Sequence, residues 1–298
     1  MGALTPSQIS DAFIAACLTE VRALKPGNVH IYAGGHGMQV ADFETSAHVA
    51  APHVSNPTLK VGERIRRAVE ATFAAVHCNT NLGILLLCAP LAAAAELPGS
   101  TALTLRANLR LSLSKLDAED AAAVFQAIAA ASPGGLGEAA TSDVRQPPDV
   151  SLLEAMHMAS TRDLIAEEYV TDFEHVFAWH DREFAPRINA GWSAEDAIAR
   201  VFLYALARVP DTHIARKFGV EAAEDVRHKA SVFEAQHFTS PDVRPSAPEV
   251  EPALLDFDAG LKAQGRNPGS LADLMAAILF VSIIGREFAN SSLRGATH

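Results

Sequence analysis

The chain has 298 residues, of which 49% are hydrophobic and 20% charged, and its formal net charge at pH 7 is -11. This length and composition fit one large or two modest globular domains and exclude a disordered chain. The negative charge gives no electrostatic footprint for DNA or RNA, so no nucleic-acid partner is expected, although a local basic pocket for a phosphorylated small molecule is compatible with it.

The cysteines and the apolar segments indicate a cytoplasmic protein with no membrane partner. Cys17, Cys78 and Cys88 lie in apolar runs without CxxC spacing, which predicts reduced, buried thiols. The N-terminus has no basic segment followed by an apolar signal core. The longest apolar stretch, 82–97, contains Pro90 and is short for a membrane span, so we expect a helix buried on all sides.

The first half of the chain has the helical period. Thr5 and Gln8 predict a capping box around Pro6, and a helix that runs to the Pro-Gly pair at 26–27. Further helices are expected at three places, which are 42–54, 61–76 and the apolar stretch after Asn79.

The second half continues this pattern. Helices are expected near 102–114, 117–132, 150–168, 170–187 and 192–209, and a last helix opens at 267–270. Ser193 with Asp196, and Ser270 with Asp273, have the spacing of capping pairs. The proline-rich stretch 239–252 predicts a loop or linker. No alternating strand pattern occurs, so the sequence predicts an all-α fold, taken as a single domain over 1–298.

Four polar segments interrupt the helical pattern: 25–30, 79–83, 134–139 and 211–217. Each gathers residues that helix interiors avoid, namely Gly, Pro, Asn, Thr and Asp. Each lies where a helix starts or stops, so their backbone donors can converge in one cleft. Bare N–H groups beside Lys and Arg suit a polyphosphate ligand, which indicates a nucleotide-handling enzyme.

Each segment also has a purely structural interpretation. The first can simply end a helix, and 79–81 can supply N-caps. The glycines at 134–137 can form a turn, because neither a Walker lysine nor a strand precedes a phosphate loop here. Asp211 and Thr212 can cap the next helix, with Arg216 and Lys217 as solvated charges.

In this order, the segments resemble the triphosphoribosyl-dephospho-CoA synthase family, over about residues 10–290. The residues that carry the resemblance are Glu20, Lys25, Pro26, Gly27, Asn28, Val29, His36, Asp42, Phe43, Ser46, Asn79, Thr80, Gly83, Gly137, Glu138, Ala139, Asp211, Thr212, Arg216, Pro268, Gly269, Ala272, Asp273 and Leu274. The resemblance implies an all-helical enzyme that displaces adenine from ATP and transfers the triphosphoribosyl unit to a hydroxyl of 3′-dephospho-CoA.

That reaction passes through a cation-like sugar. One carboxylate can stabilise this cation, and a second can deprotonate the attacking hydroxyl. We therefore expect catalytic roles for Glu20, Glu138 and Asp211, with Glu138 and Asp211 as ligands of a Mg²⁺ ion that accompanies ATP. Phosphates and sugar would be bound by Lys25, Gly27, Asn28, His36, Asn79, Thr80, Gly83, Thr212, Arg216 and Lys217. Asp42 and Asp273 are interpreted as helix-capping residues. A homodimer is also considered.

One departure concerns the second segment. Many members of the family have Thr-His-Lys-Gly where this chain has Thr80, Asn81, Leu82 and Gly83. Because that lysine could contact phosphate, its absence is compatible with a divergent branch of the family that uses another acceptor. Two alternatives stay open: a metal-dependent N-glycosidase acting on a nucleotide or ADP-ribosyl group, and a non-catalytic helical protein that binds a nucleotide.

Overall fold

The structure of the chain is a computed structural model, which describes residues 3–131 and 149–295. Within these two ranges the chain is helical and forms no strand. Two isolated bridges, His30–Ala33 and Gly35–Met38, tighten the loop after the first helix. The predicted all-α fold class is confirmed, whereas the single domain stays a prediction.

The helices follow one another along the chain. They are α1 (Pro6–Arg22), α2 (Val40–Val54), α3 (Val61–Val76), α4 (Leu82–Ala95), α5 (Leu105–Leu113), α6 (Ala118–Ala131), α7 (Leu152–Ala159), α8 (Leu164–Val170), α9 (Glu174–Trp179), the π-helical turn η1 (His180–Phe184), α10 (Ala185–Asn189), α11 (Ala194–Leu206), α12 (Thr212–Phe218), α13 (Val220–His237), α14 (Glu251–Ala263) and α15 (Gly269–Gly295).

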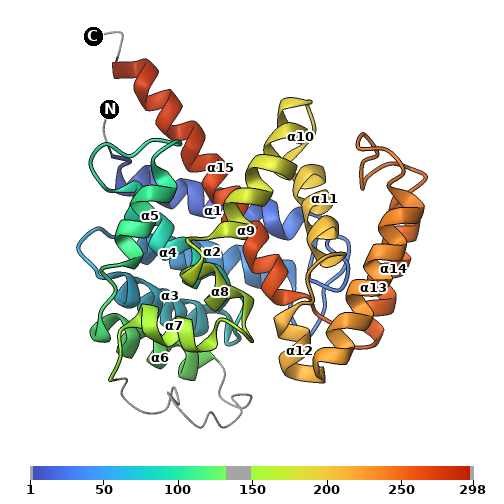
Figure 1. The fold of residues 1–298 in the computed structure, drawn as a ribbon, viewed down its shortest axis with the longest axis horizontal. Coiled ribbons are helices and arrows are strands. Elements are labelled where there is room, and N and C mark those ends of the chain that lie inside the picture. Colours follow the sequence, from blue (N-terminus) through green and yellow to red (C-terminus); the bar gives the residue numbers. More distant parts are fainter. Residues whose placement is uncertain (1–2, 132–148, 296–298) are drawn as a thin grey trace.

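The long helix α15 crosses the middle of the molecule, with α12, α13 and α14 on one side and α3 to α8 on the other (Figure 1). Its residues from Leu274 to Phe280 are all buried, and it packs against α1, α4, α9 and α11. Near its C-terminal end, the Gln8 side chain of α1 donates to Glu287 at 3.2 Å. The apolar centre of α15 therefore anchors the fold and fixes where its N-terminal end lies.

Helix α4 lies inside the bundle. All its residues from Gly83 to Ala95 are buried except Ala93, which confirms the predicted helix buried on all sides. Its apolar side chains need no polar face, because helices pack around it in several directions. No helix in the described part of the chain is long and apolar enough to cross a membrane.

The capping predictions have three different outcomes. The capping box of Thr5 and Gln8 is confirmed. Ser193 caps α11 as predicted, but the carboxylate of Asp196 bonds to Ser246 instead of closing the box. The third pair is wrong, because α15 begins at Gly269 and Ser270 therefore lies inside the helix.

Two predicted helix boundaries are also wrong. The helix expected over 150–168 is divided into α7 and α8, because the Asp163 carboxylate accepts from the backbone N–H groups of Ile165 and Ala166 and starts a new helix. The helix expected over 170–187 begins only at Glu174, because the preceding Asp172 has a positive φ of 54°. The other predicted helices agree with the structure to within about three residues.

Candidate active site at the helix ends

Several helices begin close to the N-terminal end of α15. The carboxylate of Asp211, which caps α12, accepts from the backbone N–H of Leu271 in α15 at 2.9 Å. The next residue, Thr212, accepts from the N–H of Leu164 at the start of α8 at 3.2 Å. These bonds fix the first turns of α8, α12 and α15 to one another.

The start of α4 reaches the same place through a glycine. A Cβ atom at Gly83 would lie 2.0 Å from Oδ2 of Asp273 and 2.7 Å from Cδ1 of Ile165. Only a residue without a side chain permits this approach, so the Asp273 carboxylate packs directly on the first turn of α4. The carboxylate, rather than an open space, occupies the position where Gly83 was expected to admit a ligand.

Three other acids share this region with Asp273. Burial raises the pKa of Asp273 well above its usual value, and Glu20, Asp211 and Asp163 raise it further, while Arg216 lowers it. Burial also raises the pKa of Asp211 to about 6, although the backbone N–H groups that bond its carboxylate oppose this shift. The four carboxylates therefore disfavour one another's ionised form, and their poor hydration adds to this effect.

Glu20 and Lys25 form a buried ion pair at the C-terminal end of α1. The Lys25 Nζ lies 3.1 Å from Glu20 Oε1, and Lys25 is 0% exposed. The same ammonium group donates to the backbone carbonyls of Glu20, Ala23 and Val29. All three of its protons have acceptors within the chain, so this ammonium group closes a helix end and does not face a phosphate ligand.

The loop that follows α1 lies against the turn before α15. Gly27 has a φ of +83°, and a Cβ there would lie 2.6 Å from the carbonyl oxygen of Arg266. Asn28 donates to the side chain of Asn267 at 2.8 Å, and His36 Nε2 lies 2.8 Å from the Gly27 carbonyl oxygen. The predicted loop residues Gly27, Asn28 and His36 are thus brought together with the turn before α15.

A carboxylate that the sequence analysis missed holds this loop. Asp258 accepts from the Gly27 N–H at 2.8 Å, from Lys262 at 3.0 Å, and lies 3.2 Å from His30 Nε2. Asp258 and Lys262 are one turn apart on α14, the spacing of a helical acid–base pair. That spacing was a signal, but only the folded chain brings it to Gly27.

The exposed cation Arg216 borders the acidic cluster, and two further cations lie around the nearby Phe218 ring. Arg216 donates to Asp163 at 3.0 Å, and its side chain remains 54% exposed. The Arg266 guanidinium lies 4.1 Å from the centre of the Phe218 ring, and Lys217 lies 5.3 Å from it. Asp163 and Arg266 were not predicted; both lie at helix boundaries, where position rather than motif gives them their neighbours.

The second polar segment supplies the entrance to α4. Asn81 is the N-cap residue of α4 but makes no side-chain capping bond, whereas Asn79 accepts from the N–H of Leu82 at 3.1 Å. Thr80 is 8% exposed and donates to Ser46 at 2.6 Å, and Asn81 donates to Thr72. Glu138 and the rest of the third segment lie outside the described residues.

Comparison with known proteins identifies the family. The family model described as CitG, ATP:dephospho-CoA triphosphoribosyl transferase, matches residues 6–292. The chain belongs to this family. The crystal structure of a proposed triphosphoribosyl-dephospho-CoA synthase from Archaeoglobus fulgidus has the same fold, with a TM-score of 0.62 and 24% identity over 82% of this chain and 98% of that chain. No curated protein matches the chain.

Membership of the CitG family settles the type of reaction. The chain is a transferase that uses ATP and passes its triphosphoribosyl unit to dephospho-CoA. The resemblance to this family that the ordered segments indicated is confirmed.

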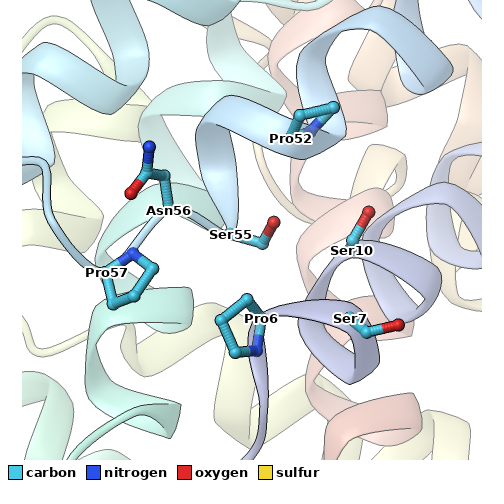
Figure 2. Close-up of a pocket in the computed structure, with 7 residues that line it drawn as sticks. All are labelled: Pro6, Ser7, Ser10, Pro52, Ser55, Asn56 and Pro57. Carbon is cyan, nitrogen blue, oxygen red and sulfur yellow. The ribbon is translucent and has the colours of Figure 1, made fainter.

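Two hollows of this CitG-family chain lie away from the acidic cluster. Figure 2 shows the first, an open depression between the N-terminal end of α1 and the C-terminal end of α2, lined by Pro6, Ser7, Ser10, Pro52, Ser55, Asn56 and Pro57. It lies at the opposite end of α1 from Glu20, about 20 Å away at 1.5 Å per residue. The second lies beside Arg22, Tyr32 and Glu251. Neither contains a predicted site residue.

Proposed function

We propose that the transfer takes place where α4, α8, α12 and α15 begin. One observation carries this proposal: the acids Asp163 and Asp273 share the same helix ends as the exposed Arg216. A nucleotide that donates a sugar needs cations for its phosphates and carboxylates near its anomeric carbon. This region offers both within one set of side chains.

The phosphates would lie along the cationic border. Arg216 and Lys217 are exposed in the last turn of α12, and Arg266 has a buried Nη1 with no hydrogen-bond partner among the described residues. Guanidinium groups bind phosphate oxygens in pairs, and an unpartnered buried N–H is stabilised when it gains an acceptor. The half-exposed ring of Phe218 offers a face on which a base can stack.

The carboxylates would act on the sugar. As the bond from C1′ to adenine breaks, positive charge develops on the ribose, and nearby negative charge lowers the energy of that state. Glu20 and Asp211 are 2% and 1% exposed and already bonded within the chain, so their contribution is to the local field and to the position of helix ends. The catalytic role predicted for Glu138 stays a prediction.

Magnesium fits as a companion of ATP better than as a resident ion. The described residues contain no group of three or more His, Cys, Asp or Glu side chains that could hold a metal ion. Both oxygens of Asp211, one of the two predicted ligands, accept from backbone N–H groups. Mg²⁺ usually keeps several waters and binds through substrate phosphates, where it would neutralise charge on the triphosphate.

The start of α4 is compatible with dephospho-CoA, the acceptor of this family. Leu82, which replaces a lysine common in the family, is partly buried and packs against the main core, so its change does not open the start of α4.

The three cysteines are free thiols, which supports a reducing compartment and thus the cytoplasm, where ATP is abundant.

The purified protein with MgATP and dephospho-CoA tests this proposal. Chromatography should detect free adenine in equal amount to a product whose mass equals dephospho-CoA plus the triphosphoribosyl unit. Formation of ADP or AMP without adenine would contradict the proposal. Adenine released at the same rate without an acceptor would instead favour the N-glycosidase, and tight ATP binding without any turnover would favour the binding protein.

A further inference from the structure

Asp273 differs from the other acids of the cluster in what contacts its carboxylate. Glu20 bonds to Lys25, Asp163 to Arg216, and Asp211 to two backbone N–H groups. Among the described residues, no hydrogen-bond donor or cation lies within bonding distance of the Asp273 carboxylate. Asp273 is also partly exposed, whereas Glu20 and Asp211 are buried.

The position of the Asp273 carboxylate restricts which residue can occupy position 83. The Asp273 carboxylate lies on the bare Cα of Gly83, in a space that any other residue at position 83 would fill. Its neighbours from the other packed elements are also acidic or neutral: Glu20 and Cys17 from α1, Cys88 from α4, and Asp163 and Asp211 at the starts of α8 and α12. Arg216 opposes them and lowers the pKa of Asp273.

An unpartnered carboxyl among other acids has no bonded donor to stabilise its ionised form, so Asp273 can carry a proton and act as a donor. We propose that Asp273 is the general acid that protonates the departing adenine. This inference rests on the proposed function, since it assumes that the ribose of ATP lies over the acidic cluster. It reverses the interpretation of Asp273 as a helix-capping residue.

The proposed step is balanced within the reaction. The Asp273 carboxyl gives its proton to a ring nitrogen of adenine while the bond between C1′ and N9 breaks, and its electron pair leaves with the base. The resulting carboxylate stabilises the positive ribose. The hydroxyl of dephospho-CoA then forms the new C1′–O bond, and its proton returns to Asp273, so that no further reactant is consumed.

The variant Asp273→Asn tests this role, because asparagine has nearly the same shape but no acidic proton. Its kcat should fall by about 10²–10⁴-fold, the usual contribution of a general acid. With 6-chloropurine riboside triphosphate, whose base leaves without protonation, the loss should shrink at least tenfold. The wild-type kcat should decrease at high pH, and the variant should lack this decrease. A matched control is Asp120→Asn, since Asp120 is a buried acid in the first turn of α6 that accepts from the backbone N–H of Gly62.

Stability gives a readout that does not depend on activity. A carboxyl whose folded pKa exceeds its unfolded pKa costs stability as the pH rises through these values. Asp273→Asn removes this cost, so its Tm at pH 7–8 should equal or exceed that of the wild type, and the gain should disappear near pH 4. A purely structural role predicts a lower Tm at every pH, and that result would overturn the inference.

A second variant guards against misfolding of the first. Gly83→Ala keeps the carboxyl but displaces it, and should also lower kcat by at least tenfold with little additional loss in the double variant. Two results would overturn the inference while leaving the proposed function intact: wild-type kcat in Asp273→Asn, or equal losses with both leaving groups. If the wild-type enzyme releases no adenine, the proposed function is contradicted. The pH dependence of Tm would still show whether Asp273 is protonated.

Discussion

At the scale of single residues, exposure separates the cations that can meet a ligand from those that hold the fold. Lys25 and Arg216 were both predicted to bind phosphate. Lys25 is 0% exposed and its protons all have acceptors, whereas the Arg216 side chain is 54% exposed and makes a single ion pair with Asp163. An exposed pair of this kind adds at most about 1 kcal/mol to stability, so its removal should be tolerated.

We therefore expect Arg216→Ala and Lys217→Ala each to raise the KM for ATP by about tenfold, the value of one charge-assisted hydrogen bond, with little change in Tm. Steady-state kinetics of adenine release measures this effect. Lys229→Ala is a matched control, because Lys229 is an exposed lysine in an ion pair with Asp225 on α13. An unchanged KM in both variants, with the control also unchanged, would remove the triphosphate from this border.

At the scale of elements, the buried pair of Glu20 and Lys25 ties the end of α1 to the loop that follows. The ammonium group binds carbonyls on both sides of the helix end, so its loss leaves a buried carboxylate and several carbonyls unpaired. Burial lowers the pKa of Lys25 and raises that of Glu20, while their mutual attraction opposes both shifts.

Lys25→Ala should accordingly destabilise the protein by about 3–5 kcal/mol, because removing one partner of a buried ion pair leaves the other uncompensated. Urea unfolding measures this loss. Restoring neutrality with Glu20→Gln in the same chain should recover part of it. A Lys25→Ala protein of wild-type stability that binds ATP weakly would instead support the phosphate role predicted from the sequence.

The helices themselves could be predicted from periodicity and caps, since α3 begins and ends as expected and α4 is buried as its composition required. Boundaries set by long-range contacts could not. The carboxylate of Glu168 accepts from the backbone N–H groups of His175 and Val176, and it thereby fixes the late start of α9. Such a contact depends on how the chain turns in space, which the local pattern does not contain.

The candidate site was predictable in part for the same reason. The described polar segments 25–30, 79–83 and 211–217 lie at helix ends that the fold brings together, and they could be predicted because residues unfit for helix interiors are visible in the sequence. The sequence did not show which of their side chains bond within the chain and are therefore not available to a ligand. The side chains of Lys25 and Asp211 bond to groups at helix ends. Asp258, which no motif marks in the sequence, bonds to the backbone of the loop at Gly27.

At the scale of the whole molecule, α15 positions the site. Its apolar middle is fixed among α1, α4, α9 and α11 (Figure 1). Its N-terminal end therefore brings Asp273 to Gly83. One cluster of buried side chains includes residues from α1 to α15, which agrees with the single domain that stays a prediction. The exposed Leu103 and Leu111 near α5 leave the predicted homodimer open to a test by light scattering.

A crystal structure with an ATP analogue and dephospho-CoA would show where the nucleotide binds. We expect the triphosphate to contact Arg216, the ribose to lie over Asp273, and a ring nitrogen of adenine to lie within hydrogen-bond distance of the Asp273 carboxyl. A nucleotide bound elsewhere, for example in the hollow between α1 and α2 in Figure 2, would contradict this expectation.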